Sequence, residues 1–133
     1  MSYKKLILSV ILVFVSFAAT DCIIHGNILL SAYNQTANLW RPQHEMHIGL
    51  IQLVNLLISI AICYSYTYFV TDKTLTNTLL YTFTIGFVMG LSAGYITYST
   101  MPITNFIASV WFFGIVTQKL IAGTILYIIY RAK

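Results

Sequence analysis

Four stretches of this chain are each long and apolar enough to cross a lipid bilayer as a helix. They cover residues of about 6–33, 46–70, 75–98 and 103–130, and short polar breaks separate them. A helix needs about 20 residues to cross ~30 Å of hydrocarbon, and a spanning segment must satisfy its own backbone hydrogen bonds. We therefore predict an all-α chain in which residues 1–133 form one membrane domain, a four-helix antiparallel bundle.

The composition agrees with a chain whose main partner is the lipid bilayer. Hydrophobic residues make up 59% of the chain and charged residues 8%, whereas soluble domains carry about 25% charged residues. The net charge of +4 is spread over several breaks, and it lacks the clustered basic face that nucleic-acid binding needs. Cys22 and Cys63 both fall in apolar stretches, so we expect free buried thiols and no disulfide.

The basic residues beside the apolar stretches predict the orientation. With four crossings, five of them share one side of the membrane and Arg41 alone lies on the other; the five are Lys4, Lys5, Lys73, Arg131 and Lys133. Because basic flanks stay in the cytoplasm, both termini are predicted to be cytoplasmic, in a bacterial inner membrane.

The N-terminus also has the pattern of a signal peptide, with Lys4 and Lys5, an apolar run and a small-residue site at Ala18. The apolar run continues to Ala32, which is longer than an ordinary signal sequence and favours a retained helix. Cleavage stays open as the alternative.

Asp21 is the acid predicted to lie deepest in the membrane. Counting ~1.5 Å per residue puts Asp21 ~24 Å and Lys119 ~18 Å above the inner surface, so the two residues are able to form an ion pair between the first and fourth helices. A buried acid of this kind either holds a helix bundle together or handles protons or ions. The sequence leaves both readings open.

The histidines raise a second possibility. His25 follows Asp21 by one helical turn, so the two side chains share a face, and His44 and His47 lie near the start of the second helix. Together the three histidines are candidate metal ligands, and His25 with His47 is a candidate haem-binding pair. No diagnostic metal or haem spacing is present, so no cofactor is predicted.

Polar residues concentrate on the outer half of the first helix and the loop that follows. We define this group as the candidate polar site, which comprises Asp21, His25, Tyr33, Arg41, Glu45 and His47. Arg41 and Glu45 are four residues apart, a spacing that permits an ion pair across the loop.

Two further patterns concern helix packing. The second helix carries a polar stripe of Gln52, Asn55 and Ser59, which either joins helices by hydrogen bonds or lines a polar cavity. The third helix carries Gly86, Gly90 and Gly94, a small-residue face that permits close approach of another helix. The sequence does not say whether that partner belongs to the same chain or to a second copy.

Most of the chain resembles a family of small, uncharacterised bacterial four-helix membrane proteins. The similarity rests on motifs that run from the first helix to the fourth: Asp21-x-x-x-His25-Gly26, Leu29, Tyr33, Leu39-Trp40-Arg41-Pro42, Glu45-Met46, Gly86-x-x-x-Gly90, Tyr98-x-x-x-Pro102 and Trp111-Phe112. The resemblance implies architecture and location and no activity. Lys119 departs from the pattern, which weakens a mechanism that needs an Asp21–Lys119 pair.

The layout is also similar to that of the small multidrug resistance transporters, which have four short helices and one membrane-buried acid in the first. Asp21 stands where that acid would be, although the family's acid is a glutamate in another context, and its members lack an outer loop of this kind.

Three hypotheses about function follow. The leading one is a non-enzymatic structural or accessory membrane protein that packs against itself or against other membrane proteins. The alternatives are a dimeric proton-coupled transporter or channel that uses Asp21, and a haem- or metal-binding subunit that uses His25 and His47.

Overall fold

The computed structural model describes residues 2–131, which form helices joined by short connections, with no strand among them. Four segments are long and apolar enough to cross a membrane: Tyr3–Ile28, Ile48–Phe69, Leu75–Thr100 and Asn105–Tyr130. The prediction of an all-helical chain with four such segments is therefore confirmed. Lys133, one of the residues used to predict the orientation, lies outside the described residues.

The first spanning segment is not a uniform α-helix. α1 (Tyr3–Ile23) runs into a π-helical turn, η1 (Ile24–Ile28), and α2 (Leu30–Gln35) follows. The Leu29 amide donates to the Ile24 carbonyl at 2.9 Å, a five-residue step that inserts one extra residue into the turn. Such π turns occur often at functional sites, and this one interrupts the helix predicted over residues 6–33.

The third spanning segment contains a second π turn. α4 (Leu75–Leu91) continues through η4 (Ser92–Ile96) into the short α5 (Thr97–Thr100). The other two segments, α3 (Ile48–Phe69) and α6 (Asn105–Tyr130), are continuous α-helices, and the loop before α3 contains the short turns η2 (Ala37–Leu39) and η3 (Gln43–Glu45).

Threonine caps explain where α4 and α6 begin. The Thr74 hydroxyl accepts a hydrogen bond from the Asn77 amide, and the Thr104 hydroxyl accepts one from the Ile107 amide, each at 3.3 Å. Each cap satisfies a backbone donor that the first turn of a helix leaves unpaired. α6 therefore starts two residues later than the apolar run that predicted it.

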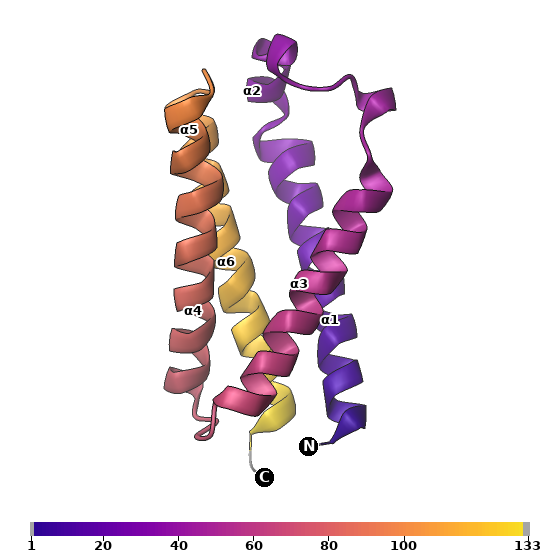
Figure 1. Cartoon of the computed structure of the whole chain (residues 1–133), viewed down its shortest axis with the longest axis vertical. Helices are drawn as coiled ribbons and strands as arrows, with labels where there is room; N and C mark the ends of the chain where they lie inside the picture. Colours follow the sequence, from indigo (N-terminus) through magenta and orange to yellow (C-terminus); the bar gives the residue numbers. More distant parts are fainter. Residues whose placement is uncertain (1, 132–133) are drawn as a thin grey trace.

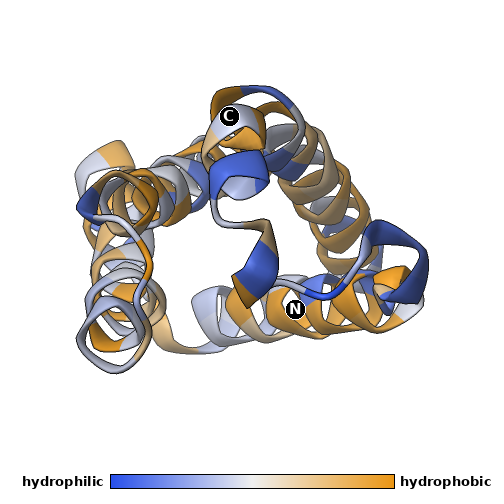
Figure 2. Ribbon diagram, turned by 90° about the horizontal axis from the view of Figure 1, so that it is seen from above, coloured by the Kyte–Doolittle hydropathy of each residue, from blue (hydrophilic) through white to orange (hydrophobic). Residues whose placement is uncertain are grey.

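The four segments alternate in direction, so the start of α1 and the end of α6 lie at the same end of the bundle (Figure 1). α6 packs closely along α4 and also along α1, whereas α3 packs mainly on α1 and meets α4 only slightly. Figure 1 shows α3 crossing obliquely, with the end that follows the loop lying away from α4. Seen from above in Figure 2, the helices are largely apolar along their length.

Buried apolar side chains form two clusters. The cluster nearer the chain ends draws on α1, α3 and α6 and consists of Val13, Phe17, Ile62, Cys63, Tyr66, Ala122 and Leu126. The cluster nearer the long loop consists of Leu29, Ile103, Ile107 and Ala108, and it contains no residue of α3. Cys63 is buried as expected, but Cys22 is exposed on the outside of α1, and both are free thiols.

The glycine face of the third spanning segment lies against α6 of the same chain. A Cβ atom added at Gly94 would lie 2.6 Å from the Ala108 carbonyl oxygen, and one added at Gly90 would lie 3.0 Å from that of Phe112. A Cβ at Gly86 would lie 3.0 Å from the Cβ of Lys119. The three glycines thus allow two backbones to approach closely, which is how small residues stabilise helix pairs in lipid.

The close approach predicts the effect of Gly94→Ala. The new methyl group would force the η4 and α6 backbones apart, and overpacking of this kind costs about 1–3 kcal/mol. We expect a lower melting temperature, measured by circular dichroism in detergent. Gly49→Ala in α3 is the control, because a Cβ there meets nothing within 4 Å. Equal melting temperatures for the two variants would contradict the packing.

Candidate functional site

Three helices meet at the carboxylate of Asp21. Its Oδ2 accepts a hydrogen bond from Asn55 Nδ2 of α3 at 2.8 Å, and its Oδ1 accepts one from Gln118 Nε2 of α6 at 2.6 Å. Gln118 is buried and also donates to the Phe17 carbonyl at 3.5 Å. Because both carboxylate oxygens accept from amide groups, the pattern suits the ionised acid, which has only acceptors to offer.

The ion pair considered for Asp21 and Lys119 is not formed. The one ion pair found among residues 2–131 joins His44 to Glu45. The Lys119 ammonium instead lies 3.8 Å from the centroid of the Phe17 ring, and Lys119 is only 3% exposed. Successive residues of a helix point about 100° apart, so Gln118 faces Asp21 while Lys119 faces Phe17 and gains a cation–π contact.

A cavity of about 230 Å³ lies beside the Asp21 carboxylate. Its lining comes from α1, α6 and both π turns: Asp21, Ile24, His25, Ala93, Val110, Trp111, Gly114, Ile115 and Gln118. Ile24 and His25 belong to η1, and Ala93 belongs to η4. The cavity therefore combines mainly apolar walls with a few converging polar groups, the usual composition of a small-ligand site.

Aromatic side chains joined by hydrogen bonds lie beside the cavity, on the side of the long loop. The Tyr33 hydroxyl lies 2.6 Å from His25 Nδ1 and accepts a hydrogen bond from Trp111 Nε1 at 2.8 Å. Since the indole is only a donor, the Tyr33 hydroxyl hydrogen is available to His25 Nδ1 in the imidazole tautomer that carries its hydrogen on Nε2. The rings of His25 and Tyr33 are stacked, and Trp40 contacts both Tyr33 and Trp111 edge-on.

The surroundings of Tyr33 favour its neutral form. Burial raises the pKa of the Tyr33 phenol, the hydrogen bond from Trp111 lowers it, and the charge of Asp21 raises it again. The net result is a pKa above the ordinary value of 10.0. Tyr33 thus keeps its hydroxyl hydrogen throughout the physiological pH range.

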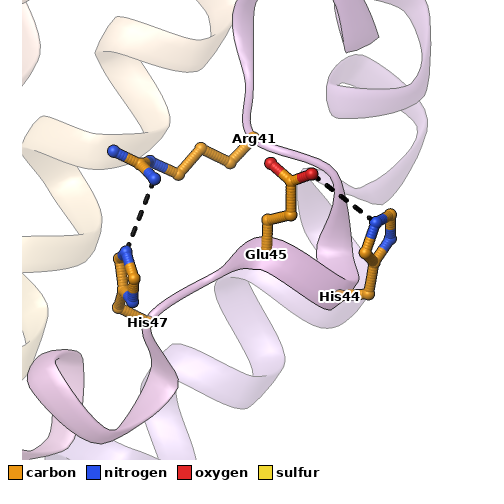
Figure 3. Close-up of polar contacts among 4 residues, drawn as sticks. All are labelled: Arg41, His44, Glu45 and His47. Carbon is orange, nitrogen blue, oxygen red and sulfur yellow. Dashed lines mark hydrogen bonds and ion pairs between the residues drawn. The ribbon is translucent and has the colours of Figure 1, made fainter.

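The loop residues of the candidate polar site lie apart from this network. Figure 3 shows that Arg41 donates to His47 Nε2 at 3.4 Å, while Glu45 faces His44, with 3.7 Å between His44 Nε2 and Glu45 Oε1. The ion pair that the spacing of Arg41 and Glu45 permits is thus not seen, and each side chain has another partner. A four-residue spacing brings side chains together on a helix, but the loop is extended at Trp40 and turns as a 3₁₀ segment at Gln43–Glu45.

The candidate polar site therefore divides into two groups. Asp21, His25 and Tyr33 belong to the cavity and its aromatic wall, whereas Arg41, Glu45 and His47 belong to the exposed loop. His25 and His47 have separate hydrogen-bond partners, and within residues 2–131 no three His, Cys, Asp or Glu side chains gather as a metal-ligand set. Asp21 and His25, which were expected to share a helix face, form hydrogen bonds with different partners.

Sequence reasoning missed three residues of the site. It weighed Asn55 only as part of a polar stripe, and it gave no role to Gln118 or to the Trp111 indole. The available signal for Gln118 was its position beside Lys119 in an otherwise apolar helix, because polar side chains in such helices usually find partners on neighbouring helices.

Comparison with models of known protein families, with curated proteins and with solved structures finds no match to this chain. The interpretation of the site therefore depends on its geometry.

The hydrogen bond from Asn55 to Asp21 predicts the effect of Asn55→Leu. The substitution leaves one oxygen of the half-buried Asp21 carboxylate without its amide partner, and an unsatisfied polar group costs up to about 1–3 kcal/mol when it is buried. We expect a loss of that size in the free energy of unfolding in detergent. Gln52→Leu removes an amide one turn earlier on the same helix, where no side-chain hydrogen bond to Gln52 occurs in the described chain, and it should have little effect. Equal losses for both variants would argue against a special role of Asn55.

Proposed function

We propose that this protein is an integral membrane protein that acts as a non-enzymatic structural or accessory component, in which Asp21 holds three helices together. The observation that carries this proposal is the pairing of both Asp21 carboxylate oxygens with amides of α3 and α6. Hydrogen bonds between helices stabilise membrane bundles by about 0.6–2 kcal/mol each. Apart from the long loop before α3, the connections are short and most of the described chain lies in the four long helical segments.

We further propose that the protein resides in a bacterial inner membrane with both termini in the cytoplasm. The start of α1 and the end of α6 share one end of the bundle with the α3–α4 connection (Figure 1), and that end carries Lys4, Lys5, Lys73 and Arg131. Arg41 is the basic residue at the opposite end. This distribution supports the orientation through the preference of basic flanks for the cytoplasm. The resemblance to small bacterial membrane proteins supports the location.

Cysteine labelling tests this orientation. In a background with Cys22→Ala and Cys63→Ala, we place a single cysteine at Asn38 in the long loop or at Thr71 in the α3–α4 connection. Both positions are exposed. We expect a membrane-impermeant maleimide to label Asn38→Cys in intact bacterial cells and Thr71→Cys only after permeabilisation. The reverse pattern would overturn the orientation.

A dimeric proton-coupled transporter or channel is the second candidate, because Asp21 and His25 both line the cavity. Proton flux into liposomes separates the two functions when the wild type is compared with Asp21→Asn. A structural role predicts equal flux and a lower melting temperature for Asp21→Asn. The carboxamide that replaces the carboxylate has one oxygen, so it no longer offers an acceptor atom to each of the two amides. Loss of a wild-type flux in Asp21→Asn would favour the transporter over our proposal.

A further inference from the structure

A second hollow adjoins the Asp21 cavity. It is a groove of about 540 Å³ between α1, η1 and α6, lined by Thr20, Ile23, Ile24, Ile28, Phe106, Ser109, Val110, Phe113, Gly114 and Thr117. Its lining is largely apolar, and the side chains of Ile23 and Phe113 are 55% and 63% exposed. In a membrane, side chains exposed at this depth contact lipid. The groove is therefore open to the acyl-chain region, whereas the neighbouring cavity holds a carboxylate.

The groove and the cavity are next to each other, with wall residues in common. Ile24, Val110 and Gly114 line both hollows. The Ile24 Cδ1 atom lies 2.8 Å from the point where a Cβ atom of residue 114 would sit. Because Gly114 has no side chain, the end of the flexible Ile24 side chain occupies this position, and Ile24 is the first residue of the π turn η1. The two hollows therefore share a wall at Ile24, Val110 and Gly114.

Asp21 is the only formally charged residue that lines either hollow. α3 and the segment from α4 through η4 contain no Lys, Arg, Asp or Glu. On α6 the one charged group is Lys119, whose ammonium lies over the Phe17 ring and outside both linings. His25 carries a hydrogen bond consistent with a neutral ring. The cavity thus presents a carboxylate and the ring of Trp111 to whatever occupies it.

We propose that the cavity and the groove together bind a cationic amphiphile, with its ammonium group beside Asp21 and its alkyl chain in the groove between α1 and α6. An ionised carboxylate has acceptor sites beyond its two amide hydrogen bonds, and an ammonium group is also attracted to the face of an indole ring. The groove offers the alkyl chain an apolar surface that is continuous with the lipid. This binding goes beyond the structural role, which holds the helices together with or without a ligand.

Fluorescence of Trp111 tests the proposal in the full-length protein. Trp40 and Trp111 are the only tryptophans in the chain, so Trp40→Phe leaves Trp111 as the sole reporter. The protein is reconstituted in phosphatidylcholine nanodiscs at pH 7 and titrated with decylamine, decanol or decyl sulfate. An alkylamine is protonated at this pH. We expect a saturable change with decylamine, at an apparent affinity at least tenfold higher than with the other two amphiphiles.

Three variants locate the binding site. Asp21→Asn should lower the decylamine affinity at least tenfold, whereas Asp72→Asn, which removes a carboxylate from the α3–α4 connection, should leave it unchanged. Gly114→Leu should also weaken binding, because its side chain fills the junction at Ile24 while the carboxylate is retained. Equal responses to decylamine and decanol, or an Asp21→Asn response equal to the wild type, would overturn the proposal. The comparison of decylamine, decanol and decyl sulfate uses the unaltered cavity. It therefore tests the proposal even if one of the cavity variants fails to fold.

Discussion

A carboxylate inside the apolar part of a membrane is costly, about 2.5–3.5 kcal/mol on insertion scales. The packing of α3 and α6 on α1 offsets this cost, because both helices supply hydrogen-bond donors to Asp21. The hydrogen-bond donors to the Asp21 carboxylate are two neutral amides, those of Asn55 and Gln118, and not a cationic side chain. The hydrogen bond from Asn55 matters most for α3. This helix packs largely on α1 and contributes no residue to the buried cluster near the long loop. The bond from Asn55 is thus the polar connection of α3 to the rest of the bundle at this level.

The bundle combines one tightly packed pair with two more loosely attached helices. Gly86, Gly90 and Gly94 bring the backbones of α4 and η4 close to that of α6. α1 joins this pair through the hydrogen bond between Asp21 and Gln118, and α2 joins it through the hydrogen bond between Tyr33 and Trp111. Between these two attachments, the π turns η1 and η4 both contribute to the walls of the cavity. The polar groups and the extra residue in each turn thus lie around a cavity of about 230 Å³.

The sequence predicts those features that depend on one helix at a time. Segment length predicts four candidate spans, and the spacing of Gly86, Gly90 and Gly94 predicts a close helix contact. Features that depend on the relative rotation of two helices were not predictable. The depth of Asp21 and Lys119 in the membrane suggested that they could pair. The rotation of α6, however, places Gln118 at the Asp21 carboxylate. The four-residue spacing of Arg41 and Glu45 brings side chains together only on a helix, whereas these two residues lie in a loop. The π turns at Ile24–Ile28 and Ser92–Ile96 have no distinctive sequence signal.

The central claim is that the Asp21 carboxylate binds Gln118 across the interface of α1 and α6. A double-mutant cycle with Asp21→Ala, Gln118→Ala and the double variant, measured by reversible unfolding in detergent, tests this claim directly. We predict a favourable coupling energy of about 0.6–1.7 kcal/mol, the range found for hydrogen bonds between membrane helices. Losses that simply add in the double variant would contradict the account, because side chains that do not interact show no coupling.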